Sequence, residues 1–155
     1  MKALKILVPW CLVLLIALAF FAPVGPLPGF LIGGAPSEVP GSWGETAGIH
    51  EITLEVPGPL PRVVIIWVVQ SEGDLYIVGA RDSGWVSMLG RGGPVRMRME
   101  DNTFSMNATL LDTGWEPIIK AYLAKYRSGY PEIVDGFPSL DDAAGSISVF
   151  RLTGQ

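Results

Sequence analysis

Residues 62–80 read RVVIIWVVQSEGDLYIVGA, and this stretch decides the expected fold. Its first part, 63–69, is an unbroken run of β-branched and aromatic residues, which is typical of a strand covered on both faces. Ser71-Glu-Gly-Asp74 has the composition of a tight turn, and 75–80 is a second apolar run. The stretch therefore predicts a β-hairpin built on a central strand.

Four more segments have the pattern of strands. Residues 50–56 alternate apolar and polar side chains, which indicates a strand with one buried face, ended by Pro57. Residues 95–99 and 103–111 predict a second hairpin, and 147–152 predict a closing strand. Together with the first hairpin this gives about six strands, and we expect them to form a small antiparallel barrel, because closure leaves no unpaired sheet edges.

One helix is expected to flank the barrel. Asp112 or Thr113 can cap its start, Pro117 falls in its first turn, and Gly129 follows its end. Its apolar residues recur with helical spacing and are Ile118, Ile119, Tyr122, Leu123 and Tyr126. A single helical turn is expected at 85–89. The predicted fold class is thus a mainly β domain, a small antiparallel barrel with one flanking helix.

The N-terminal stretch predicts a transmembrane helix, because residues 6–37 carry no charged side chain. Residues 6–25 would form a helix of about 30 Å, the hydrocarbon thickness of a bilayer. Lys2 and Lys5 precede this stretch, and the next basic residue is Arg62. The asymmetry places the N-terminus in the cytoplasm and the domain on the periplasmic or extracytoplasmic side. The representative anchor residues are Ile6, Trp10, Leu14, Leu18 and Phe21.

A cleaved signal peptide is the alternative interpretation of this stretch. Ala17-Leu-Ala19 has the small residues of a cleavage site. Phe20 and Phe21, however, keep the following residues strongly apolar, and this favours a retained single-pass anchor. Both interpretations place the domain beyond the membrane.

The chain divides into an anchor at 1–25, a linker at 26–48 and a barrel domain at 49–155. Residues 23–41 hold five prolines and five glycines, a composition typical of an extended, semi-rigid spacer. Residues 27–32 form an apolar patch within it. This patch lies along the membrane, pads the domain or packs on another membrane protein, and the sequence leaves these roles open.

Composition excludes several functions. The net charge of −4 argues against a nucleic-acid binder, which needs a basic face. A single cysteine and a single histidine exclude a disulfide framework and the usual zinc sites. The histidine, His50, opens a strand and is expected at the surface, so no Ser-His-Asp triad is predicted. The sequence therefore offers no catalytic residue and no metal site.

Several short motifs carry a resemblance to a known family. They are Arg62-x-Val-x-Ile-Trp67, Leu75-Tyr-x-Val78, Ser83-Gly-Trp-Val86, Pro94-Val-Arg-Met97 and Ala121-Tyr-x-x-Lys-Tyr126. Over residues 50–152 the chain resembles the split β-barrel of the pyridoxamine-phosphate-oxidase-like superfamily. It is most similar to the deazaflavin (F420)-dependent, nitroreductase-type branch.

The resemblance implies a flavin (FMN) or deazaflavin (F420) bound at a dimer interface. Its cofactor-binding residues would be Arg62, Trp67, Arg81, Ser83, Trp85 and Lys125, with the phosphate at the 81–85 loop. This chain departs from the family pattern at two places. Trp85 or Val86 replaces the basic residue that follows Ser-Gly, and Pro57-Gly-Pro-Leu-Pro61 replaces a Gly-Arg-Lys-Ser-Gly type segment. Both replacements weaken anion binding.

Three functions follow as hypotheses. The sequence favours a membrane-anchored accessory subunit without cofactor, whose barrel braces a complex of integral membrane subunits, and it leans against an enzyme. The first alternative is a tethered FMN- or F420-dependent oxidoreductase. The second is a barrel that binds a small ligand or haem without catalysis.

Overall fold

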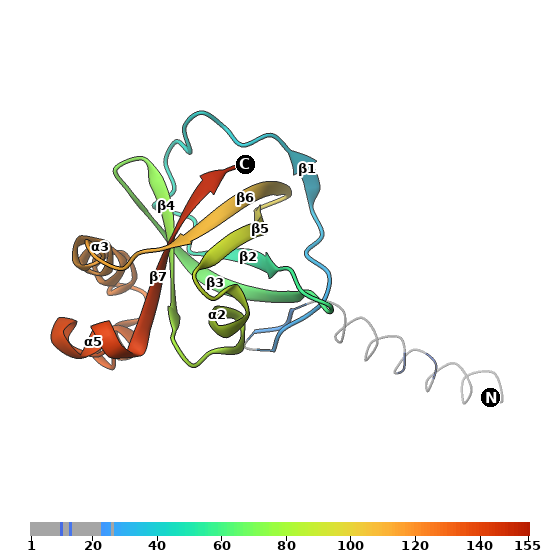
Figure 1. Ribbon diagram of the computed structural model, residues 1–155. Helices are drawn as coiled ribbons and strands as arrows, with labels where there is room; N and C mark the ends of the chain where they lie inside the picture. Colours follow the sequence, from blue (N-terminus) through green and yellow to red (C-terminus); the bar gives the residue numbers. More distant parts are fainter. Residues whose placement is uncertain (1–9, 11–12, 14–22, 26) are drawn as a thin grey trace, which may run out of the picture.

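The computed structural model describes residues 10, 13, 23–25 and 27–155, and a closed β-barrel forms most of this part (Figure 1). Six antiparallel strands follow one another in the order β6-β5-β2-β3-β4-β7, and β7 pairs with β6 to close the barrel. Their bounds are β2 Glu51–Val56, β3 Arg62–Ser71, β4 Asp74–Ala80, β5 Gly92–Met99, β6 Asn102–Leu110 and β7 Ile147–Gly154. The predicted barrel of six strands is confirmed.

The β3–β4 hairpin forms where the sequence predicts it. Val68 lies opposite Ile77, and Ser71 lies opposite Asp74 at the end of the ladder. Glu72 and Gly73 make the turn, with φ angles of 51° and 89°. A two-residue turn with positive φ at both positions matches the right-handed twist of the strands, so the hairpin register is set locally.

In the part of the chain that the structure describes, four helices accompany the barrel, more than the single flanking helix expected. They are α2 Gly84–Leu89, α3 Glu116–Tyr126, α4 Pro131–Asp135 and α5 Leu140–Ser146. Helix α3 is the predicted flanking helix, and α2 is the predicted helical turn. Helices α4 and α5 have only five and seven residues. A helix of one or two turns is too short to show an apolar period in the sequence, which explains why neither was predicted.

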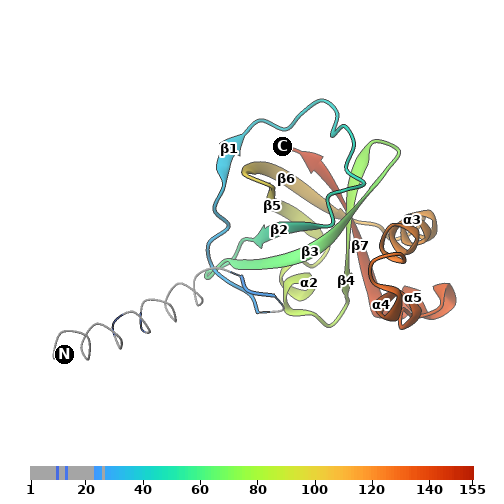
Figure 2. The same ribbon diagram turned by 180° about the vertical axis from the view of Figure 1, so that it is seen from behind.

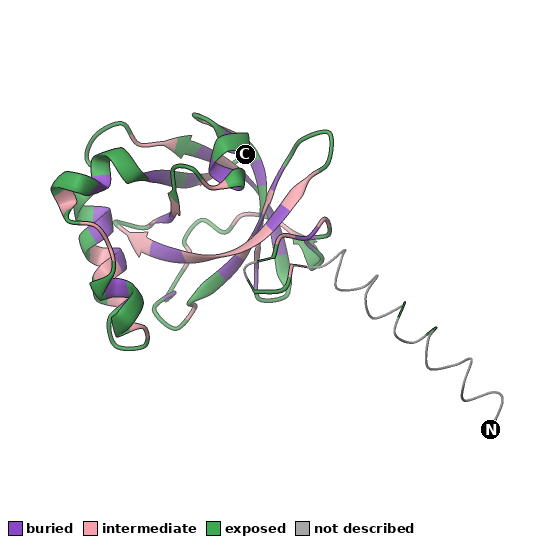
Figure 3. Cartoon of the chain, turned by 90° about the horizontal axis from the view of Figure 1, so that it is seen from below, coloured by how far each residue is buried: buried purple, intermediate pink, exposed green. Residues whose placement is uncertain are grey.

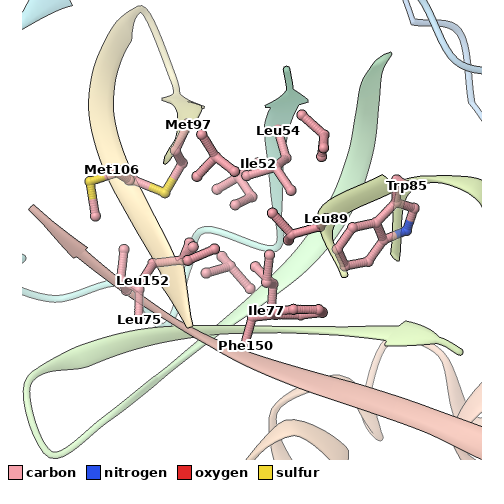
Figure 4. Close-up of a cluster of buried hydrophobic side chains, with 14 of the residues drawn as sticks. Ile52, Leu54, Leu75, Ile77, Trp85, Leu89, Met97, Met106, Phe150 and Leu152 are labelled. Carbon is pink, nitrogen blue, oxygen red and sulfur yellow. The ribbon is translucent and has the colours of Figure 1, made fainter. Parts of the chain in front are cut away.

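Two hydrophobic clusters lie on opposite sides of the sheet. The first fills the barrel (Figure 4), and it includes Leu54, Val68, Ile77, Met97, Met106 and Phe150. The second lies between the outer face of the sheet and helices α3 to α5, and it includes Val69, Val78, Ile119, Tyr122, Tyr126 and Val149. Figure 3 shows buried residues along both the strands and the helices. Strand β3 is therefore covered on both faces, as its unbroken apolar sequence predicts.

The segment 27–49, here called the strap, runs along the outside of the barrel (Figure 2). Within it β1, Ala35–Ser37, pairs in parallel with β6. Ile32 and Thr46 are 3% and 2% exposed, so side chains of the strap are buried as well. The residues expected to form a spacer are thus bound to the barrel.

Among the described residues, no helix combines the length and apolarity that crossing a membrane requires. Four of the predicted anchor residues, Ile6, Leu14, Leu18 and Phe21, lie outside the described residues. Trp10 is described, and it is 70% exposed. The anchor stays a prediction.

Candidate functional site

The six residues that the resemblance implies for cofactor binding do not line one groove. Residues alternate between the two faces of a strand, and Arg62 and Trp67 are five positions apart on β3, an odd spacing. Arg62 packs against α2: a Cβ built on Gly84 would lie 3.0 Å from its Cζ atom. Trp67 stacks instead on Tyr126 beside α3, with ring centroids 4.1 Å apart. The expected set is therefore divided between the two sides of the sheet.

Arg62 and Ser83 are the two predicted residues that the structure brings together. Gly84 lies next to Ser83 in the chain, and its lack of a side chain lets the Arg62 guanidinium approach the main chain. Arg62 Nε and Ser83 Oγ are both buried, and neither has a hydrogen-bond partner among the described residues. Buried polar atoms are rarely left unpaired, so this pair can receive a small acceptor such as an anion oxygen.

Arg81 is engaged elsewhere. Its Nη2 atom donates to the carbonyl of Ala144 at 2.9 Å and to that of Ile147 at 3.4 Å. These carbonyls lie at the end of α5 and the start of β7. The guanidinium therefore ties the last helix to the closing strand.

Trp85 lies in the barrel cluster rather than at a polar surface. It is 7% exposed, and its ring centroid is 5.8 Å from that of Phe150. Figure 4 shows it at the edge of the same cluster as Leu89 and Ile77. Its ring also lies over Gly79, where a Cβ would come within 2.2 Å of Trp85 Cζ2. Trp85 is thus a barrel-filling side chain.

Lys125 and Tyr126 hold the strap to α3 and β3. The Lys125 ammonium donates hydrogen bonds to three main-chain carbonyls, those of Thr46 at 3.1 Å, Ile49 at 2.7 Å and Val68 at 2.9 Å. The Tyr126 hydroxyl accepts from Val68 N at 3.0 Å, and the His50 carbonyl lies 2.5 Å from it. Burial lowers the pKa of Lys125 and raises the pKa of Tyr126 to about 12. Lys125 is therefore occupied by internal contacts.

An aromatic group surrounds this junction, and the sequence analysis did not identify it as a unit. Trp67, Tyr122 and Tyr130 all lie within 6.3 Å of the Tyr126 ring, measured between centroids. Next to it is an apolar hollow of about 290 Å³ between β3 and helices α3 and α4. Its lining residues are Ile65, Ile66, Trp67, Val78, Tyr122, Leu123, Ile133, Val134 and Phe137. The signal available in the sequence was the spacing of five positions between Arg62 and Trp67, which places Trp67 on the face of β3 opposite to Arg62.

The described part of the chain holds no group of three or more His, Cys, Asp or Glu residues placed to hold a metal ion. His50 is exposed at the start of β2, as expected. Its ring lies 5.9 Å from Tyr126 and 6.2 Å from Tyr130, centroid to centroid.

Comparisons with known proteins identify the fold. No protein-family model and no curated protein matches the sequence. Among solved structures, a NimC/NimA family protein from Clostridium acetobutylicum is 20% identical, with a TM-score of 0.51 over 68% of this chain and 74% of that chain. The heme storage protein HutZ from Vibrio cholerae is 19% identical, with a TM-score of 0.51 over 69% and 82%. The chain shares their split-barrel fold.

A third solved structure has the same fold. The FAD and heme binding protein from Mycobacterium smegmatis is 16% identical, with a TM-score of 0.51 over 70% of this chain and 62% of that chain. These likenesses show the fold alone, and the pyridoxamine-phosphate-oxidase-like superfamily stays a resemblance. The F420 branch stays a prediction, because neighbours at such low identity share architecture alone.

Proposed function

We propose that this protein is a membrane-anchored accessory subunit whose extracytoplasmic split barrel braces a larger membrane protein complex. The uncharged stretch 6–25 supports the anchor, and the position of Lys2 and Lys5 supports the orientation. In this proposal the partners are the lipid bilayer and integral membrane subunits, and the barrel works without a resident flavin or deazaflavin.

The observation that carries the proposal is that three expected cofactor-binding side chains are already used inside the fold. Trp85 packs in the barrel, Arg81 binds carbonyls at the end of α5 and the start of β7, and Lys125 binds carbonyls of the strap and β3. A phosphate or a flavin ring would have to displace these contacts. The residues of one chain therefore do not fit the complete cofactor site that the resemblance implies.

Membrane extraction and spectroscopy test this proposal. We expect the full-length protein to stay in membranes through high-salt and carbonate washes, since an apolar span is released only by detergent. The protein purified in mild detergent should elute with integral membrane proteins and show no absorption band of a flavin, a deazaflavin or haem. Release by salt, or a stoichiometric cofactor band, would contradict the proposal.

A separate experiment with reporter fusions tests the orientation. A reporter enzyme that is active only outside the cytoplasm should be active when fused after Gln155, and a cytoplasm-only reporter at the same position should be inactive. The reverse result would place the barrel in the cytoplasm and favour the oxidoreductase.

The alternative is an FMN- or F420-dependent oxidoreductase, and the Arg62–Ser83 pair is the observation that favours it. Arg62 Nε and Ser83 Oγ are buried without partners, and in a cofactor complex they would donate to a phosphate group while the cofactor supplied hydride chemistry. HutZ and the Mycobacterium smegmatis protein are described as binding haem, or FAD and haem, on the same fold.

Titration of the purified protein with FMN and with F420 tests the alternative. If it holds, cofactor fluorescence changes should saturate, and Arg62→Gln should weaken binding roughly tenfold, the loss of one charge-assisted hydrogen bond. Arg91→Gln is the matched control, because the Arg91 side chain is 75% exposed and pairs with Asp112. Titrations that do not saturate, or equal affinities for both variants, would remove this alternative.

A further inference from the structure

The connection between the predicted anchor and the barrel is fixed by main-chain hydrogen bonds. Val24 and Leu27 exchange two main-chain hydrogen bonds of 3.1 and 3.0 Å, which close a tight loop. Gly29 and Val63 exchange two more, of 2.8 and 2.9 Å, and these attach the loop to the start of β3. The predicted span runs to residue 25, but Val24 lies in this bridge and Gly25 has a φ of 54°, so residues 24 and 25 belong to the loop and not to a helix. From there the chain reaches the barrel without a free spacer.

Large apolar side chains are exposed where this connection meets the barrel. Leu27 is 68% exposed and Leu31 is 62% exposed, and Leu60, in the connection between β2 and β3, is 70% exposed. Val24 at 53% belongs to the same group, here called the apolar end of the barrel. Figure 1 shows the β2–β3 connection and segment 27–31 at one end of the barrel, away from helices α3 and α5.

The sequence of the apolar end is uncharged as well as apolar. Neither 23–37 nor 56–61 contains an Asp, Glu, Lys or Arg residue. In space, Leu31 also lines a hollow with Glu51, Arg98 and Glu100, so charged side chains border this group on one side. Exposed leucines grouped in this way are unfavourable in water, and an apolar group rimmed by polar residues marks an interaction surface. A lipid interface is the occupant that matches, because it accepts apolar side chains and the adjoining span would hold the barrel end against it.

We infer that the apolar end of the barrel lies on the bilayer surface, with Leu27 and Leu60 inserted among the lipid headgroups. The inference rests on the proposed membrane anchor and adds the orientation of the domain. The barrel is then held in one pose, with the apolar hollow beside α3 and α4 turned away from the lipid and available to other subunits.

Site-directed fluorescence quenching on the full chain tests this pose. In a Cys11→Ser background, Leu27→Cys and Leu60→Cys each give one thiol for a bimane label. Ile133→Cys is the matched control, since Ile133 is 56% exposed on α4, away from the apolar end. The labelled proteins are reconstituted into phosphatidylcholine vesicles that contain lipids with a nitroxide on the headgroup or on a shallow acyl position.

We expect the nitroxide lipids to reduce bimane emission about twofold at 27 and 60 and to leave it nearly unchanged at 133, because interfacial side chains reach ~5–10 Å into the headgroup region. Flotation of the vesicles gives the separate readout for the anchor. Protein that fails to float contradicts the anchor and with it the proposed function. Protein that floats with an unquenched label at either 27 or 60 overturns the pose and leaves the anchor standing.

Discussion

Gly79→Ala is expected to destabilise the barrel by about 3 kcal/mol, near the upper end for overpacking a rigid core. The added methyl group would lie 2.2 Å from Trp85 Cζ2 and 2.7 Å from Val86 Cγ2. The indole cannot move aside easily, because it is buried against Phe150. Urea unfolding of the detergent-solubilised chain, followed by circular dichroism, measures the change in unfolding free energy.

A double variant and a control make this result specific. Trp85→Leu removes the ring that the methyl group meets, so Gly79→Ala should cost less in the Trp85→Leu background than alone, a coupling of about 1 kcal/mol or more. Gly145→Ala adds a methyl group with no atom within 4 Å, and inside α5 it should stabilise the protein by up to about 1 kcal/mol, the helix preference of alanine over glycine. Additive losses in the double variant would show that Trp85 is not wedged over Gly79.

This contact bears on the function because Trp85 is one of the six residues that the resemblance implies for cofactor binding. Here its ring turns into the barrel and packs with the core. Gly79 lies directly under the ring, where a side chain would not fit. Trp85 is therefore held by core contacts.

The strands were predictable because their evidence is local. The β-branched run at 63–69 and the alternation at 50–56 each report how many faces of a strand are covered, and the structure covers those faces. The strap was not predictable in the same way. Its prolines and glycines exclude a helix, but composition does not say which surface the segment contacts. Strand β1 pairs with β6, about 65 residues away in the chain, and no local sequence pattern indicates a pairing over that separation.

The candidate site was predictable only in part, for a reason visible in the residue spacing. Arg62 reaches the residue next to Ser83, because its guanidinium packs against Gly84 at the start of α2. Trp67 lies five positions beyond Arg62, so strand alternation places it on the opposite face of β3. The resemblance implies both residues for cofactor binding and takes no account of this alternation. No local sequence pattern indicates that Lys125 points into the strap. Its partners are main-chain carbonyls, which every residue has, so the identity of the partner residues gives no signal.

Lys125→Met is expected to lower the unfolding free energy by about 1–3 kcal/mol, because it removes a charged donor from three carbonyls. The Ile49 carbonyl loses its donor, whereas the Thr46 carbonyl still accepts from Ile49 N and the Val68 carbonyl still accepts from the Tyr126 hydroxyl. Methionine keeps the length and apolar character of the lysine stem, so the variant isolates the ammonium. The loss should appear first in the strap: amide hydrogen exchange at 46–50 should become faster before the barrel strands are affected, since local opening is the cheaper event.

Lys120→Met is the matched control on the same helix. Lys120 is exposed, and its replacement should change stability by about 0.5 kcal/mol or less. Equal effects of the two variants would mean that the Lys125 ammonium does not hold the strap. If the strap does loosen in Lys125→Met, the label at Leu60 in vesicles should stay quenched, because β3 and the Gly29–Val63 bonds, not Lys125, set the position of the apolar end. In that case Lys125 fixes the end of the strap beside α3, and the Gly29–Val63 hydrogen bonds fix the end beside the predicted anchor. The pose of the barrel depends on the Gly29–Val63 bonds.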